Sequence, residues 1–184
     1  MRILMLGNSF TSANNLPGRL SGVLGSEVVA HTRGGARLAE QLNPATRNGS
    51  RTLSALSDGG WDFVVMQEMS NGPIVSTEKY LEAVEALAAL VRGAGAVPVI
   101  YQTWAYEEGS ARLARSGWGY AEMHDLLARA CREAERRSQA LFAPVGDAFF
   151  TSPDAHALYA RDGAHPSERG TDLAVRVIAE TIGG

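Results

Sequence analysis

The chain has 184 residues, a length that suits one domain of ordinary size. Hydrophobic residues make up 45% of it and charged residues 20%, a globular composition that excludes a disordered chain. There are 17 lysines and arginines against 20 aspartates and glutamates, and the resulting net charge of −3 argues against a nucleic-acid-binding surface.

Short apolar runs alternate with longer helical patterns along the sequence. The apolar runs predict strands at residues 3–6, 28–30, 62–66, 97–101 and 141–145. Apolar residues at three-to-four spacing predict helices at about 77–92 and about 120–137, and a last helix with Pro166 at its first position. The opening run is too short for a signal peptide, so we expect a cytoplasmic protein unless a leader has been removed.

This alternation of strands and helices predicts the fold class. Strands that alternate with helices form a parallel sheet covered on both faces. We therefore expect one domain over residues 1–184, a three-layer α/β/α sandwich of the flavodoxin-like type with five parallel strands in the order 2-1-3-4-5. Ligands of such sheets bind outside the carboxyl ends of the strands, so chemistry is expected directly after each strand.

A serine follows the first predicted strand where the chain must turn sharply. Gly7-Asn8-Ser9 puts the hydroxyl of Ser9 at the carboxyl edge of the sheet, which makes Ser9 the candidate nucleophile. The alternative is that Ser9 only caps a helix, a common role for serine. The pattern Gly-x-Ser-x-Gly is absent from the sequence, so an α/β-hydrolase is not indicated.

Four histidines are candidates for a general base, and His165 is favoured. It lies three residues after Asp162, so a turn can bring the carboxylate to one ring nitrogen and leave the other free. His156 is a competitor in a proline-containing segment, and His31 ends the second predicted strand. His124 falls within a helical pattern, where a packing role is expected.

The early serine, the glycine pair after the second strand and the late Asp162-x-x-His165 resemble the SGNH hydrolases, the GDSL-type esterase and lipase superfamily. The resemblance spans nearly the whole chain in the expected order. It implies a serine esterase that forms an acyl-enzyme, with Ser9 as nucleophile, His165 as base and Asp162 orienting the histidine. This division of labour is that of a Ser-His-Asp triad.

The oxyanion-hole residues are less clear because two sequence blocks depart from the family pattern. Gly35 is the better match for the family's glycine, and Gly34 stays open. The third block reads Gln-Glu-Met-Ser-Asn in place of Gly-x-Asn-Asp, so either Gln67 or Asn71 can supply the amide. We favour backbone N–H groups of Ser9 and Gly35 with the side chain of Gln67, and keep Asn71 in reserve.

Aromatic residues after the fourth strand are candidates for substrate binding. Trp104, Tyr106 and Trp118 follow that strand and could stack on a sugar ring; the alternative is that they pack a long loop onto the body. No long apolar lid is visible, which favours a short acyl group. The expected partner is thus a small-molecule ester, with an acylated sugar as one candidate, and the oligomeric state is not predicted.

A different function class fits the same fold. Hydroxyl groups after the first strand could hold the phosphate of flavin mononucleotide, with Trp61, Trp104 or Tyr106 beside the ring; a non-catalytic ligand-binding domain is the third option. The favoured hypothesis, an esterase, needs no cofactor or metal. Cys131 is the only cysteine, which excludes a zinc site of several thiolates, and no apolar run is long enough for a membrane span.

Overall fold

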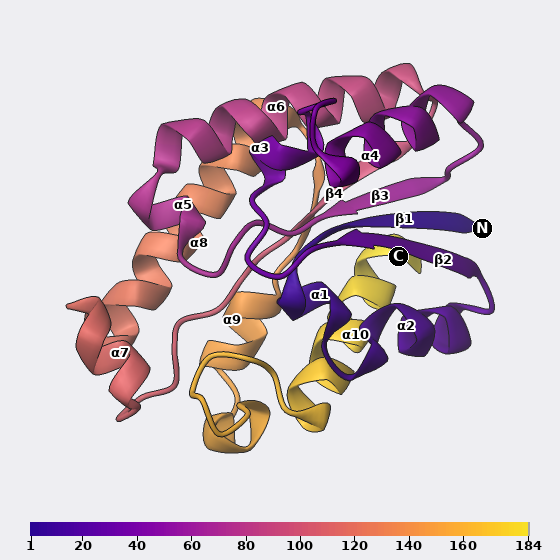
Figure 1. Cartoon of the computed structure of the whole chain (residues 1–184). Helices are drawn as coiled ribbons and strands as arrows, with labels where there is room; N and C mark the ends of the chain where they lie inside the picture. Colours follow the sequence, from indigo (N-terminus) through magenta and orange to yellow (C-terminus); the bar gives the residue numbers. More distant parts are fainter. Residues whose placement is uncertain (184) are drawn as a thin grey trace.

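The computed structural model describes residues 1–183, which form a parallel β-sheet between two layers of helices (Figure 1). The strands are β1 (Arg2–Gly7), β2 (Glu27–Thr32), β3 (Phe63–Met66), β4 (Val97–Tyr101) and β5 (Leu141–Ala143). All neighbouring pairs are parallel and the order is β2-β1-β3-β4-β5. The predicted fold class and strand order are confirmed.

The helices connect the strands and cover the two faces of the sheet. They are α1 (Ser9–Ser12), α2 (Leu16–Leu24), α3 (Leu38–Gln41), α4 (Arg47–Asp58), α5 (Gly72–Val75), α6 (Thr77–Gly93), α7 (Ala111–Ser116), α8 (Tyr120–Ser138), α9 (Val145–Phe150) and α10 (Glu168–Gly183), with 3₁₀ turns at Ala13–Asn15 and Ala155–Leu158. In Figure 1, α3, α4, α6 and α8 lie above the sheet, and α1, α2, α9 and α10 lie below it. Among residues 1–183, no helix combines the length and apolar character of a membrane span.

Two hydrophobic clusters hold these layers together. Successive residues of β1 alternate between them: Ile3 packs into the cluster that contains α2 and α10, and Leu4 packs into the cluster that contains α4 and α6. This is the period of a strand that is covered on both faces, and it explains why residues 3–6 are continuously apolar. The sheet is therefore a rigid base for the loops at its edge.

Two element ends differ from the sequence-based expectation. Helix α10 begins at Glu168 and not at Pro166, because Ser167 serves as the cap: its hydroxyl accepts a hydrogen bond from the Gly170 amide at 3.1 Å. Strand β5 ends at Ala143, two residues early. Pro144 follows directly and cannot donate a backbone hydrogen bond to the ladder.

Strand register brings several loops to one place. Gly7 pairs with Thr32 across β1 and β2, and Leu6 pairs with Met66 across β1 and β3. The three strands thus end at nearly the same level, and their loops leave the sheet side by side. This carboxyl edge is where a flavodoxin-like fold holds its ligands.

Candidate active site

The turn after β1 presents Ser9 at the carboxyl edge. Gly7 is needed there because a Cβ on it would lie 2.6 Å from Oε1 of Gln67. Asn8 caps α1, its Oδ1 accepting a hydrogen bond from the Phe10 amide at 3.1 Å. Ser9 is the first residue of the helix, so its own N–H has no acceptor within the helix. The expected cap is present, but Asn8 provides it, which leaves the hydroxyl of Ser9 free for another role.

The loop before α10 holds His165 against Asp162. His165 Nδ1 lies 2.5 Å from Asp162 Oδ2, and Oδ1 of the same carboxylate accepts hydrogen bonds from the backbone amides of His165 and Ala164 at 3.0 and 3.1 Å. Gly163 makes this tight turn possible with a φ of +68°, a conformation that favours glycine. The carboxylate thereby fixes both the orientation of the ring and the backbone that carries it.

Burial by itself raises the pKa of Asp162, but the hydrogen bonds to its carboxylate outweigh that effect. The donors are the His165 ring and the amides of His165 and Ala164, and together they hold the pKa below its usual value. Asp162 therefore stays ionised at neutral pH and favours a proton on Nδ1 of the imidazole. The other ring nitrogen, Nε2, is then free to accept a proton.

The turn after β1 meets the loop before α10 at this point, because Ser9 Oγ lies 2.9 Å from His165 Nε2, 156 residues away in sequence. The Phe10 ring meets the His165 ring edge-on, with 5.3 Å between centroids, and helps to hold it. The pair opens into a cleft of about 430 Å³, a size typical of small-ligand sites. The cleft is lined by Asn8, Ser9, Phe10, Gly35, Met69, Ser70, Asn71, Tyr106, Arg112 and His165.

The other three histidines have different surroundings. His31 is 3% exposed, its Nδ1 lies 3.0 Å from Thr52 Oγ1, and burial lowers its pKa to about 4. His156 pairs with Glu107 at 3.1 Å on the surface, and His124 stacks on Phe150 with 3.9 Å between ring centroids. Of the four histidines, all of which the structure describes, only His165 lines the cleft.

Gln67 does not face the cleft, contrary to the sequence-based expectation. Its Oε1 accepts hydrogen bonds from the Asn8 amide at 3.0 Å and from the Thr11 hydroxyl at 2.9 Å, and its Nε2 donates to the Glu68 carbonyl. Only 1% of Gln67 is exposed. These contacts engage both ends of the side-chain amide, so Gln67 braces the turn beneath Ser9, and it is not among the residues that line the cleft.

Glu68 is a residue of this region that the sequence did not single out. It is 4% exposed, and its carboxylate accepts hydrogen bonds from the amides of Leu38 at 2.9 Å and Met69 at 2.8 Å. Burial raises the pKa of Glu68 more than these hydrogen bonds lower it. It ties the loop after β2 to the loop after β3, and Asn8 ties the loop after β1 to Ala36 at 3.0 Å. We call Thr11, Gln67 and Glu68, none of which lines the cleft, the polar layer.

Gly35 and Asn71 line the cleft, whereas Gly34 does not. Gly35 has a φ of +67° at the third position of a turn closed by a hydrogen bond from the Ala36 amide to the Arg33 carbonyl at 2.9 Å, the position at which a type II turn requires glycine. Asn71 precedes α5, but its side chain makes no capping hydrogen bond to that helix. Gly35 and Asn71 therefore offer an N–H group and a carboxamide at the cleft.

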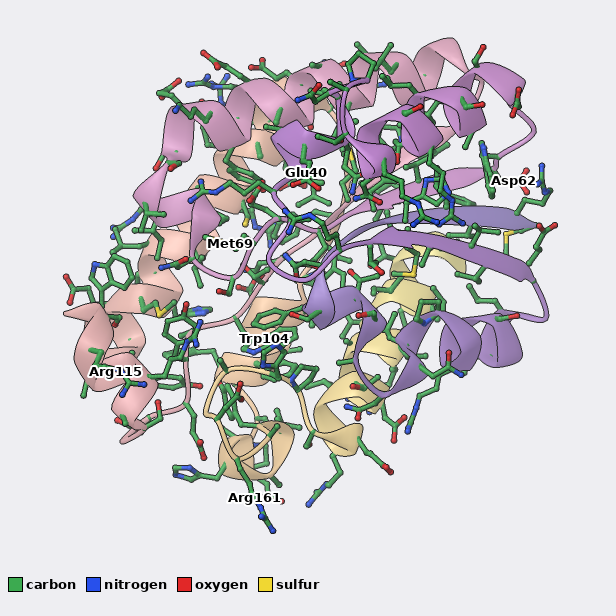
Figure 2. All side chains as sticks on the ribbon, viewed as in Figure 1. Glu40, Asp62, Met69, Trp104, Arg115 and Arg161 are labelled. Atoms are coloured by element: carbon green, nitrogen blue, oxygen red, sulfur yellow. The ribbon has the colours of Figure 1, made fainter. Side chains whose placement is uncertain are left out.

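The aromatic residues behave differently from the expected sugar platform. Trp104 is 1% exposed and lies between Phe10 and Phe149, at centroid distances of 4.6 and 4.1 Å, with Nε1 donating to the Ala164 carbonyl at 3.0 Å. Figure 2 shows it inside the molecule, well inward of the surface residue Arg161. Trp118 packs against the core and does not line the cleft. Neither tryptophan presents a face to a ligand in the cleft, so the expectation that Trp104 and Trp118 bind substrate is wrong.

Tyr106 alone of the three expected aromatics forms part of the cleft wall. The flavin alternative loses two of the three residues expected beside the ring: Trp61 comes two residues before β3, at the opposite edge of the sheet, and Trp104 is buried. Within residues 1–183, no group of three or more His, Cys, Asp or Glu side chains is arranged to hold a metal ion.

Comparisons with known proteins add an independent line of information. No protein-family model matches the sequence, and no curated protein matches it. A solved structure from Slackia heliotrinireducens, assigned to the SGNH hydrolases, is 50% identical in sequence, covers 99% of this chain and 98% of its own, and superposes with a TM-score of 0.96.

More distant structures share the fold. A DUF4886 family protein from Bacteroides uniformis is 20% identical with a TM-score of 0.78, and covers 99% of this chain and 82% of its own. The acetyl-xylooligosaccharide esterase Axe2 from Geobacillus is 15% identical with a TM-score of 0.70, and covers 100% and 94%. The Slackia protein is identical to this chain at half of the residues, over nearly the full length of both. The chain therefore belongs to the SGNH hydrolases.

Proposed function

We propose that this hydrolase is a serine esterase for short-chain esters, with Ser9 as the nucleophile. The observation that carries the proposal is the 2.9 Å contact between Ser9 Oγ and His165 Nε2, backed by the 2.5 Å contact between His165 Nδ1 and Asp162. A serine within hydrogen-bond reach of an oriented imidazole is the arrangement that activates a hydroxyl for attack on a carbonyl.

The reaction proceeds in two steps. His165 removes the proton of Ser9 as Oγ attacks the ester carbonyl, and then passes that proton to the departing alcohol, leaving an acyl-enzyme. Water, deprotonated by the same imidazole, attacks the acyl group and releases the acid and free Ser9. Asp162 remains ionised throughout and stabilises the imidazolium that forms in each step.

The oxyanion of each tetrahedral intermediate needs donors in the cleft. We assign the backbone N–H groups of Ser9 and Gly35 and the carboxamide of Asn71 to this role, in place of Gln67. Support comes from the cleft lining, which includes all three residues and does not include the buried Gln67. Preorganised donors of this kind stabilise charge in the transition state at little reorganisation cost.

A short acyl group suits the size of the cleft, about 430 Å³. One fold neighbour acts on acetylated xylo-oligosaccharides, so a sugar acetate is a candidate substrate. The absence of both tryptophans from the cleft lining removes the expected stacking platform and weakens that candidate. The acyl group is thus the better-supported part of the substrate.

A chain-length series tests the proposal. We expect kcat/KM to be highest for 4-nitrophenyl acetate and to fall through the butyrate to the octanoate, with acetate released from acetylated xylo-oligosaccharides measured alongside. The Ser9→Ala variant is the control that separates the site from background hydrolysis. Equal hydrolysis by the two proteins, or no hydrolysis of any ester, would overturn the assignment.

A further inference from the structure

The cleft carries a positive charge that the esterase chemistry does not use. Two of its lining residues can be cationic, Arg112 and His165, and none of its lining residues is acidic. His165 has its role in the reaction, whereas Arg112 takes no part in proton transfer. Its charge persists at every working pH, because guanidinium does not lose its proton in proteins.

Arg112 is held at the cleft by the structure of α7. Ser110 caps this helix, accepting a hydrogen bond from the Leu113 amide at 3.1 Å, and Leu113 is 7% exposed, so it anchors the helix in the core. The guanidinium carbon of Arg112 lies 5.0 Å from the centroid of the Tyr106 ring. That ring is fixed in turn, since the Tyr106 hydroxyl lies 3.0 Å from Ser70 Oγ.

No carboxylate neutralises this guanidinium. Arg33 is paired with Glu40, and Arg19 with Asp172 at 2.6 Å, but Arg112 has no ion pair within residues 1–183. Glu107, on the loop that leads to α7, instead pairs with His156 at 3.1 Å. The Arg112 charge is therefore available to a ligand in the cleft.

We propose that Arg112 selects esters that carry an anionic group, a carboxylate or a phosphate, close to the scissile bond. The inference rests on the esterase function proposed above and names its substrate class. The planar guanidinium suits bidentate hydrogen bonds to such groups, and Tyr106 holds it by a cation–π contact without consuming its charge. A neutral ester of the same shape would leave these hydrogen bonds unmade.

Two matched ester pairs test the selectivity. The charge lies on the alcohol side in 4-acetoxybenzoate, whose neutral partner is 4-acetoxybenzamide, and on the acyl side in monomethyl succinate, whose neutral partner is methyl succinamate. For at least one pair, Arg112→Gln should lower the anionic-to-neutral ratio of kcat/KM by about 10-fold. Arg112→Lys should retain part of that ratio, and added salt should lower it in the wild-type protein.

Arg115→Gln is the matched control, because Arg115 lies on the same helix, is exposed and does not line the cleft (Figure 2). It should leave all four rates at the wild-type value. An unchanged ratio in Arg112→Gln for both pairs, with Ser9-dependent hydrolysis of the neutral esters intact, would overturn the selectivity and leave the esterase function standing. If the wild-type protein shows no Ser9-dependent hydrolysis of any of these esters, both the selectivity and the esterase function are overturned.

Discussion

The cleft and the polar layer beneath it contain similar side chains with opposite hydrogen-bonding states. In the cleft, Asn71 has a carboxamide without a capping bond, and the side chain of His165 is 39% exposed. In the polar layer, Gln67 and Glu68 are almost fully buried and their polar groups are engaged with neighbouring loops. The type of a residue at the sheet edge therefore does not determine its role. Its role depends on how many of its hydrogen bonds are already made inside the protein.

This contrast has a physical cause. A buried polar group without a partner costs about 1–3 kcal/mol, so the layer that joins three loops must be fully paired. A group that stabilises a transition state must keep part of its capacity for the substrate. We therefore expect substitutions in the cleft to change the rate more than the stability, and substitutions in the polar layer to do the reverse.

The largest effect is expected for Ser9→Ala. Removal of the nucleophile should lower kcat for 4-nitrophenyl acetate by about 10⁴–10⁶, because serine and histidine act as a unit. Circular dichroism and the melting temperature should stay close to those of the wild-type protein, since the only side-chain hydrogen bond of Oγ within residues 1–183 is the one with His165. Activity within tenfold of wild type would contradict the role of Ser9.

Asp162→Asn should follow, with a loss in kcat of about 10³–10⁴. The substitution keeps the size of the side chain but removes the negative charge that holds the proton on Nδ1 of His165. Asp162→Glu, which retains the charge, is the comparison variant and should recover part of the rate. If the two variants lose equal activity, charge is not what Asp162 supplies.

Asn71→Ala should lower kcat by about 10²–10³, the cost of one oxyanion donor, with a smaller change in KM. Asn71→Asp is the matched control for shape: it keeps the size of the side chain but replaces the donor with a negative charge, and should be at least as slow. Wild-type kcat in Asn71→Ala would return the oxyanion role to another donor.

Gln67→Met tests the polar layer. The substitution leaves the buried Asn8 amide and Thr11 hydroxyl without their acceptor, and should lower the free energy of unfolding by about 1–3 kcal/mol. In a chain of this size each kcal/mol corresponds to about 2–4 °C in melting temperature. A variant as stable as wild type with kcat reduced a hundredfold would show that Gln67 acts on the substrate and does not brace the turn.

A pH dependence of stability is expected from the buried His31. In the folded protein the pKa of His31 is about 4, below the ordinary value near 6.5, so the unfolded chain binds a proton more readily. Stability is therefore lost as the pH falls from about 6.5 to about 4. The loss is on the order of 2–3 kcal/mol. Glu68, whose pKa burial raises, acts in the opposite direction, so His31 must be isolated by comparison.

Unfolding in urea at about pH 4.5 and about pH 7 provides that comparison, because these two pH values span most of the range between the folded and the unfolded pKa of His31. The difference in unfolding free energy between the two values of pH should be smaller in His31→Gln than in the wild-type protein, whatever the stability of the variant at neutral pH. Equal differences in both proteins would show that folding does not lower the pKa of His31.

Much of the fold was predictable because it depends on local patterns. Apolar runs located all five strands, and their alternation with helices predicted the sheet. Ser9 was recognisable because it directly follows the first strand, and the Asp162–His165 pair because it directly precedes the last helix; the sequence marks both of these boundaries. These features need only a few neighbouring residues.

The rest of the site depends on contacts between distant segments. Gln67 and Asn71 carry the same amide and both follow β3, and only the contacts of Gln67 with Asn8 and Thr11, 59 and 56 residues away in sequence, separate their roles. Trp104 is stacked between Phe10 and Phe149, which lie far from it in the sequence, one before it and one after it. Such contacts have no local signal in the sequence.

The most direct test of the central claim is to label the protein with a fluorophosphonate and map the adduct by mass spectrometry after trypsin digestion. Wild-type protein should carry one adduct, on Ser9 within the peptide of residues 3–19, and His165→Ala should be labelled at least about a hundredfold more slowly. An adduct on any other residue, or equal labelling rates in the two proteins, would contradict the assignment of Ser9 as a nucleophile activated by His165.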